Sequence, residues 1–319
     1  MTAMPPTPLP PSSAAPSLSR RQFVAAALAA PLVPRAFAES GFAFRYLLAS
    51  AMYGQKPLDV VCEQARSLGM ASLDLWPKVH GGQREEVDLR GAAAVHRQVA
   101  DRGLTIDCLT RYDLGADRLD DECRVARTLG ATTIVSGPKG RRPRRDELRP
   151  AVERFVRSMQ PHVETAAENG VAIAIENHRS NLFEHPDSLR YLADLTQTGV
   201  MQRHLMAAVA PAHLDQDAEA IAGLVRDLGP KIAVFYAWER GNEFLRTEPT
   251  GRELEQLPGR GSFDFAPVVA ALAAIDYRGW TSLFMHPVPR GIPAAGTVDQ
   301  TTREIAAARR HLDSLLTPN

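Results

Sequence analysis

One pattern runs through most of the chain and restricts its fold more than any other feature. From Phe44 onward, short apolar runs alternate eight times with longer segments in which apolar residues recur every three or four positions. Short apolar runs favour buried strands, and the longer spacing favours amphipathic helices. The expected strands are Phe44–Ser50, Ala71–Trp76, Leu104–Thr110, Thr132–Gly137, Val171–Glu176, Leu205–Ala210, Ile232–Ala237 and Trp280–Phe284.

The helical segments lie between and after these strands. Four of them are followed by glycine just before the next strand, at Gly69, Gly103, Gly130 and Gly170. Glycine suits the left-handed cap that turns a helix back towards a sheet. The expected helices are Leu58–Leu68, Leu89–Asp101, Arg118–Leu129, Asp146–Asn169, Pro186–Leu195, Ala218–Leu228, Phe265–Ala274 and Val298–Leu315.

Eight strand–helix units within about 280 residues are typical of a closed parallel barrel. An open doubly wound sheet is the alternative, but no glycine-rich dinucleotide-binding fingerprint follows the first strand. We therefore predict an α/β fold, a (β/α)8 TIM barrel, over residues 39–319. The longest insertion runs from Glu239 to Ser262, and we expect this seventh βα loop to cover part of the site.

The first 38 residues have the features of an export signal. They contain the adjacent arginines Arg20 and Arg21, an apolar run from Val24 to Val33, and a small-x-small tripeptide at 36–38. The apolar run is shorter than the roughly 20 residues that span a bilayer. We expect residues 1–38 to be a cleaved twin-arginine signal peptide, although an incidental amphipathic tail is the alternative. The mature protein would then be periplasmic or otherwise exported, with no stable membrane anchor.

Composition indicates an ordinary globular protein with a large core. Hydrophobic residues make up 45% of the chain, and 37 basic residues balance 37 acidic ones. Such a chain has no overall field that would recruit nucleic acid or an anionic membrane. We expect Cys62, Cys108 and Cys123 to be buried free thiols, with one disulfide and one free thiol as the alternative. The sequence does not decide between a monomer and a homo-oligomer.

In a barrel of this kind, functional side chains lie at the carboxyl ends of the strands. Carboxylates and imidazoles gather at or just past these ends, at Glu176, His178, His213, Glu239 and His286. Aromatic residues at strand ends can stack on the C–H face of a sugar ring, and cationic residues near the mouth can hold a substrate. The residues expected to bind substrate are Trp76, Lys139, Asn177, Tyr236, Trp238 and Arg290.

Three stretches of this sequence resemble a known family. They are Ala174–His178, Gly259–Phe265 and Asp276–Leu283, together with His213 after the sixth strand. These stretches resemble the xylose isomerase-like barrels, which include sugar isomerases, sugar epimerases and endonuclease IV repair enzymes. The resemblance covers nearly the whole mature chain and implies activity of the sugar phosphate isomerase or epimerase type. Nuclease activity is disfavoured, because no charge pattern here follows a phosphate backbone.

The resemblance also implies a metal site, from which this chain departs. In the sugar epimerases a divalent metal is held by Glu, Asp, His and Glu at the ends of strands five to eight. The matching positions here are Glu176, Ala210, Tyr236 and Phe284. Only Glu176 is an adequate ligand, so the chain is identified as a member with an altered ligand set.

A rearranged metal site is one possibility that the sequence leaves open. His178 and His286 lie two residues beyond Glu176 and Phe284, and therefore on the same face but one layer nearer the mouth. A metal displaced outwards would take His178, His213 and His286 with Glu176 or Glu239. Such a nitrogen-rich set suits zinc, manganese or iron. Alternatively, the histidines bind sugar hydroxyls.

These observations predict an enzyme that acts on a small carbohydrate by removing a proton next to a carbonyl group, as an isomerase or epimerase does. Glu176 would be the general base or a metal ligand, Glu239 the second carboxylate, and His213 would polarise the carbonyl. One alternative is a lyase or hydrolase of keto-glycosides. Another is a non-catalytic carbohydrate-binding barrel that has lost the family's metal site.

Overall fold

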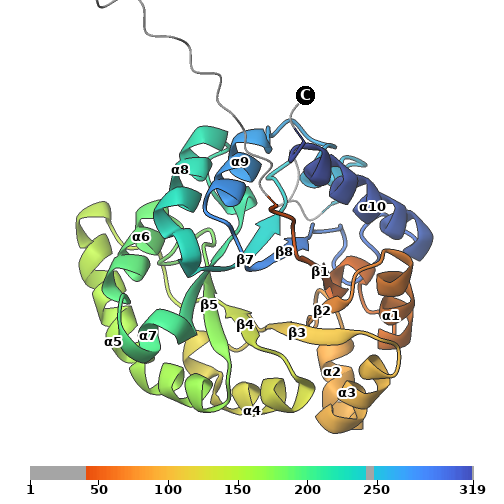
Figure 1. Cartoon of the computed structure of the whole chain (residues 1–319), viewed down its shortest axis with the longest axis horizontal. Helices are drawn as coiled ribbons and strands as arrows, with labels where there is room; N and C mark the ends of the chain where they lie inside the picture. Colours follow the sequence, from red (N-terminus) through yellow and green to blue (C-terminus); the bar gives the residue numbers. More distant parts are fainter. Residues whose placement is uncertain (1–40, 242–247, 318–319) are drawn as a thin grey trace, which may run out of the picture. The chain divides into compact units, whose positions relative to one another are not determined.

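The computed structural model describes residues 41–241 and 248–317. In this part of the chain, eight parallel strands close into a barrel in chain order, from β1 to β8. Figure 1 shows the helices arranged outside the ring of strands. The predicted TIM barrel is therefore confirmed. The predicted export signal at residues 1–38, and residues 242–247 of the seventh βα loop, lie outside the described residues and stay predictions.

The strands are short and almost fully buried, because the barrel core packs against one face and the helices against the other. Pairing of β1 with β8 closes the ring and sets Leu47 opposite Ser282 and Leu48 opposite Leu283. The strands are β1 Tyr46–Ala49, β2 Ser72–Leu75, β3 Thr105–Thr110, β4 Thr133–Ser136, β5 Ala172–Glu176, β6 Leu205–Val209, β7 Ile232–Ala237 and β8 Trp280–Leu283.

The α-helices match the expected ones except at two places. Gln83–Arg90 forms a helix that was not expected, and Gly91, with a φ of 83°, separates it from the helix that begins at Ala92 within the expected Leu89–Asp101. Gly199–His204 forms a second additional short helix. The helices are α1 Leu58–Ser67, α2 Gln83–Arg90, α3 Ala92–Ala100, α4 Asp120–Leu129, α5 Leu148–Glu168, α6 Pro186–Leu195, α7 Gly199–His204, α8 Ala218–Leu228, α9 Ala266–Ala274 and α10 Val298–Ser314.

Short 3-10 helices complete the connections. One of them, Pro211–His213, follows β6 directly and carries a predicted site residue. The others are Ser50–Tyr53, Ala116–Arg118, Arg145–Glu147, Gly229–Lys231 and Glu253–Gln256.

Two further expectations from the sequence are confirmed. Gly69, Gly103, Gly130 and Gly170 all have positive φ, between 63° and 84°, at the turns from helix to strand. The three cysteines are buried and free. Within residues 41–241 and 248–317, no helix has both the length and the apolar character needed to cross a membrane.

Candidate active site

A cavity of about 280 Å³ opens at the carboxyl ends of the barrel strands. Six of the residues predicted from the sequence line it: Trp76, Glu176, His178, His213, Trp238 and His286. The remaining lining residues are Pro77, Lys78, Val79, His80, Thr110, Tyr112, Asp113 and Phe284. Glu176, His178, His213 and His286 are the ionisable lining residues that the strand ends predicted, whereas Lys78, His80, Tyr112 and Asp113 were not predicted.

Glu176 is the last residue of β5, and its carboxylate is buried in the cavity wall. The Tyr112 hydroxyl donates a hydrogen bond of 2.7 Å to Oε2, and Nε2 of His213 lies 3.8 Å from Oε1. Burial raises the pKa of Glu176 to about 8, with a smaller contribution from the nearby charge of Asp74. The hydrogen bond from Tyr112 opposes this shift. Glu176 therefore changes its charge near neutral pH.

The two histidines beside Glu176 are neutral. The rings of His178 and His213 lie 4.1 Å apart between centroids. Burial lowers the pKa of both imidazoles, and that of His213 well below its usual value. Nδ1 of His178 lies 2.9 Å from the carbonyl oxygen of Arg179. Because a carbonyl only accepts hydrogen bonds, the neutral His178 ring carries its proton on Nδ1.

Asn177 holds the backbone that carries His213. Its amide nitrogen donates to the carbonyl oxygen of Ala210 at 2.9 Å, and its amide oxygen accepts from the Ala210 nitrogen at 2.8 Å. The backbone nitrogen of His213 donates to the same carbonyl at 3.2 Å. The structure thus places Asn177, which was expected to bind substrate, in a fully buried bridge between the ends of β5 and β6.

Aromatic rings form the opposite wall of the cavity. Trp76 and Phe284 are stacked with centroids 4.6 Å apart and an angle of 15° between their planes. Trp238 meets Phe284 edge-on at 5.2 Å. Tyr236 lies beneath this wall, where its hydroxyl is 3.0 Å from Oγ1 of Thr110. Trp76, Trp238 and Phe284 thus give the cavity an apolar, aromatic part of its lining.

A second buried carboxyl group, Asp74, does not line the cavity but contacts two residues that do. It accepts hydrogen bonds from Nε1 of Trp76 at 2.6 Å and from Oγ1 of Thr110 at 2.9 Å. Burial raises the pKa of Asp74 to about 7, although these hydrogen bonds oppose the shift. Asp74 therefore holds the Trp76 indole by a hydrogen bond, and its charge acts on Glu176.

The residues expected to hold a metal do not assemble around one point. Glu176, His178 and His213 lie together, whereas the His286 ring packs against His80 at 4.8 Å and Trp238 at 5.0 Å. The described residues contain no group of three or more His, Cys, Asp or Glu side chains placed to bind a metal ion. The residues present therefore do not fit the family's metal.

The positions that correspond to the family's other ligands explain this misfit. Tyr236 and Phe284 are buried aromatic residues whose rings lie 6.1 Å apart. Ala210 supplies only a methyl group, and its backbone is engaged by Asn177. Aromatic packing therefore occupies the part of the barrel where the resemblance implies a metal.

Besides Asn177 and Tyr236, the predicted site residues Glu239, Lys139 and Arg290 are not among the residues that line the cavity. Oε2 of Glu239 accepts hydrogen bonds from the backbone nitrogens of Ser262 and Phe263, at 3.0 and 2.9 Å. Burial raises the pKa of Glu239 to about 7. Nζ of Lys139 lies 3.5 Å from the backbone oxygen of Asp113. Burial lowers the pKa of Arg290 to about 10. No observation here tests the roles predicted for these residues.

Like Tyr112, His80 is one of the cavity-lining residues that the sequence did not predict. It lies in the loop between β2 and α2, lines the cavity, and stacks beside His286. Burial lowers the pKa of His80 to about 4, and the charge of Arg290 contributes. His80 does not lie at a strand end, which is why the search of strand ends did not find it. It could have been found from its position four residues after Trp76, in the loop that follows β2.

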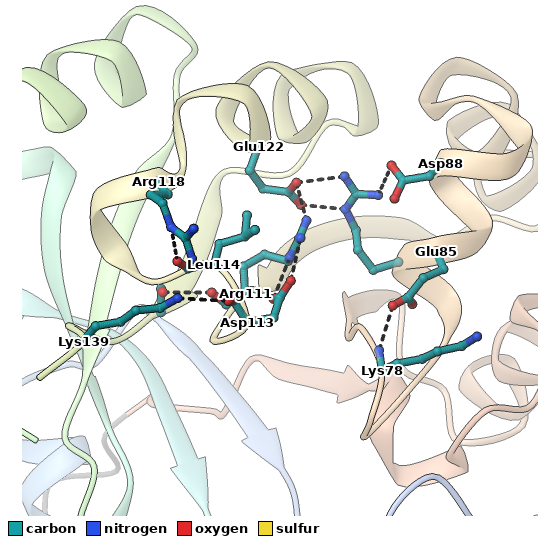
Figure 2. A network of polar contacts seen from close by, with 11 residues as sticks. Lys78, Glu85, Asp88, Arg111, Asp113, Leu114, Arg118, Glu122 and Lys139 are labelled. Atoms are coloured by element: carbon teal, nitrogen blue, oxygen red, sulfur yellow. Dashed lines mark hydrogen bonds and ion pairs between the residues drawn. The ribbon is translucent and has the colours of Figure 1, made fainter. Parts of the chain in front are cut away.

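A buried ion network supports one edge of the cavity (Figure 2). The Glu122 carboxylate lies between two guanidinium groups, with Arg84 at 2.7 Å and Arg111 at 2.5 Å. Arg111 also binds Asp113 at 2.8 Å and lowers the pKa of that carboxyl group. Arg84 comes from α2, Glu122 from α4 and Arg111 from the end of β3. The network therefore links two outer helices to Asp113 in the lining of the cavity.

Comparison with protein families gives one match. The model of the family described as xylose isomerase-like TIM barrel matches residues 62–314. No curated protein matches the sequence significantly.

Several solved structures share the architecture. D-psicose 3-epimerase from Clostridium cellulolyticum H10, solved with D-tagatose, is 15% identical, with a TM-score of 0.64 over 86% of this chain and 100% of the other. The IolI protein with a bound zinc atom is 14% identical, with a TM-score of 0.66 over the same shares. The probable 3-DHS dehydratase AsbF from Bacillus anthracis is 13% identical, with a TM-score of 0.59, again over 86% and 100%. At these identities the likeness establishes the fold.

Proposed function

Because the chain belongs to the xylose isomerase-like TIM-barrel family, we propose that it is an enzyme that acts on a small carbohydrate by moving a proton at the carbon next to a carbonyl group. The similar structures include a protein named as a sugar 3-epimerase and one named as a probable dehydratase. Epimerisation or elimination beside a carbonyl group begins with removal of a carbon-bound proton.

The single observation that carries this proposal is the environment of Glu176. Its carboxylate is buried beside the cavity, accepts a hydrogen bond from Tyr112 at 2.7 Å and lies 3.8 Å from His213. A carboxylate with a pKa of about 8 is a much stronger base than an ordinary glutamate. Tyr112 holds Oε2, which leaves Oε1 on the side of His213.

The neutral imidazole of His213 supplies the complementary group. A neutral imidazole donates a hydrogen bond through one nitrogen without bringing a full positive charge into the cavity. In the proposed step, Glu176 accepts the proton from carbon while His213 donates a hydrogen bond to the carbonyl oxygen, on which negative charge develops. Delivery of this proton from Glu176 to the neighbouring carbon, the former carbonyl carbon, together with transfer of the hydroxyl proton to the former carbonyl oxygen, completes an isomerisation.

The cavity walls support a carbohydrate as the substrate. The stacked pair of Trp76 and Phe284 offers a flat apolar surface to one face of a sugar ring. The neutral His80 and His178 offer hydrogen bonds to hydroxyl groups. A ring bound between these walls would have Glu176 and His213 at its edge.

Exchange of carbon-bound hydrogen tests the proposal without requiring the natural substrate. The protein is incubated in D2O with D-fructose, D-tagatose, D-psicose and 3-keto-glycosides, and deuterium incorporation is followed by NMR. We expect incorporation that speeds up as the pH rises towards 8, because Glu176 must be ionised to accept the proton. Glu176→Gln should lower the rate by at least about 100-fold, the usual contribution of a general base.

The matched control is Glu304→Gln. Glu304 is a mostly buried glutamate on α10 that pairs with Arg260 outside the cavity, and its replacement should leave the exchange rate unchanged. Full exchange by the Glu176→Gln variant would refute the role of Glu176. Release of the second sugar from a keto-glycoside, in a reaction that depends on Glu176, would identify the enzyme as a lyase or hydrolase.

A further inference from the structure

The hydroxyl group of Tyr112 lies at the border of the cavity, where it could also turn towards water or a bound ligand. Its side chain is only partly buried, and it lines the cavity two residues after the end of β3. A hydrogen bond in such a place keeps one geometry only if the surrounding residues lock the side chain. The 2.7 Å contact with Oε2 of Glu176 therefore depends on what holds Tyr112.

The backbone just before Tyr112 is bonded to β4. The backbone nitrogen of Arg111 donates to the carbonyl oxygen of Val135 at 2.8 Å. Oγ of Ser136, the last residue of β4, donates to the carbonyl oxygen of Arg111 at 2.9 Å. Both polar backbone groups of residue 111 are thus paired, and the chain enters Tyr112 from a fixed point.

The side chain of Arg111 ties together the two residues that flank Tyr112. Its Nε and Nη2 atoms donate to the two carboxylate oxygens of Asp113, at 3.0 and 2.8 Å. Its Nη1 atom binds the buried Glu122, which Arg84 also holds. Paired contacts between a guanidinium and a carboxylate fix an orientation as well as a distance. The ion network in Figure 2 therefore restrains the segment that carries Tyr112.

Gly137, the residue after β4, packs against the ring of Tyr112. A Cβ atom at Gly137 would lie 2.8 Å from Cε1 of Tyr112, closer than a Cβ atom approaches another carbon in proteins. The φ of Gly137 is not positive, so glycine is needed here for space and not for the backbone conformation. Any larger residue would displace the ring, and with it the hydroxyl group that meets Glu176.

We propose that Gly137 and Arg111 are positioning residues that hold the Tyr112 hydroxyl on the carboxylate of Glu176. Both act through Tyr112, because neither of them lines the cavity. With Oε2 engaged by the tyrosine, Oε1 is the atom that accepts the carbon-bound proton. The effect on the reaction rate rests on the proposed function, whereas the position of Tyr112 is measurable without a substrate.

NMR of the full chain, labelled with 13C at Cζ of tyrosine, measures the position of the hydroxyl group. The chain has six tyrosines, and Tyr112→Phe identifies the signal of Tyr112 by removing it. At pH 9 Glu176 is mostly ionised, because its pKa is about 8, and the signal reports the bond to a charged acceptor. Gly137→Ala and Arg111→Lys should each move this signal towards its position in Glu176→Gln. An unmoved signal would overturn the role of the residue that was changed.

Matched controls separate this effect from a general change in the fold. Gly223→Ala adds the same methyl group where no described heavy atom beyond the backbone of its own helix lies within 4 Å. Arg144→Lys alters an exposed arginine that binds Asp146, with the same two-residue spacing as Arg111 and Asp113. Neither control should move the Tyr112 signal. Equal movement in a control and in its matched variant would overturn the proposal.

Exchange rates measure what the position of Tyr112 does for the reaction. In deuterium exchange with D-fructose, D-tagatose and D-psicose, Gly137→Ala should lower kcat at least about tenfold and leave KM unchanged, because misalignment affects the transition state more than binding. Tyr112→Phe should do the same, and the double variant should be no slower than Tyr112→Phe alone. A further tenfold loss in the double variant would show that Gly137 acts by another route, and would overturn its role.

The two measurements separate the positioning role from the proposed function. Movement of the Tyr112 signal in Gly137→Ala and Arg111→Lys, together with no exchange in the wild type, would refute the proposed function alone. Exchange that depends on Glu176, together with an unmoved Tyr112 signal in both variants, would refute the positioning role alone.

Discussion

Replacing Glu176 with glutamine should stabilise the protein, and the gain should grow as the pH rises. The folded protein holds Glu176 with a pKa of about 8, against 4.5 for the ordinary group. Between these values the folded state keeps a proton that the unfolded state releases, so the free energy of unfolding falls with increasing pH. At 1.36 kcal/mol per pH unit, the cost is about 1 kcal/mol at pH 5, about 3 at pH 7 and about 5 at pH 9. Glutamine does not titrate and avoids this cost.

Urea unfolding of both proteins at pH 5, 7 and 9 measures the effect. The advantage of Glu176→Gln should increase by about 4 kcal/mol between pH 5 and pH 9. The control is Ile134→Val, a fully buried change on β4, which should cost about 1 kcal/mol equally at each pH. If the gain in the free energy of unfolding from Glu176→Gln were the same at all three pH values, or smaller at pH 9, the conclusion that Glu176 is buried with a raised pKa would be refuted.

Two further predictions concern the support of the cavity. Arg84→Met should lower the free energy of unfolding by about 3 kcal/mol, because it leaves the buried Glu122 with one guanidinium partner; unchanged urea unfolding would contradict this. Gly261→Ala should lower the melting temperature, because a Cβ atom there would meet Oε2 of Glu239 and the backbone oxygen of Glu255 at 2.3 Å. The control, Gly223→Ala, has no described heavy atom within 4 Å of its new Cβ and should not lower it. Equal melting temperatures for these two variants would contradict the close packing at Gly261.

The barrel was predictable because its strands are buried on both faces. Continuous apolar runs such as Ile232–Ala237 therefore mark them clearly, and that strand has the predicted ends. Helix α2 was missed for the opposite reason. Its eight residues are mostly charged, and only Val87 is an apolar residue buried against the core, so no apolar periodicity marks it.

In the candidate site, too, the positions of side chains on strand ends were predictable, whereas those of side chains in loops were not. Side chains fixed by strand geometry, such as Glu176 and His178, reach the cavity. Alternation along a strand places Asn177, between them, on the other face, and the structure finds it bonded to Ala210. Beyond the strands, hydrogen bonds within the loops decide where a side chain goes. Glu239 accordingly binds the backbone at Ser262 and Phe263, and no local pattern indicated that contact.

The last paired residues of β5 and β6 are Glu176 and Ala208. Beyond them, the side-chain amide of Asn177 makes two further hydrogen bonds to the backbone of Ala210 and so extends the contact between the two strands. The backbone nitrogen of His213 donates a hydrogen bond to the same Ala210 carbonyl oxygen, which connects the turn that bears His213 to Asn177. The distance of 3.8 Å between the His213 imidazole and the Glu176 carboxylate is therefore supported by hydrogen bonds at the barrel end itself.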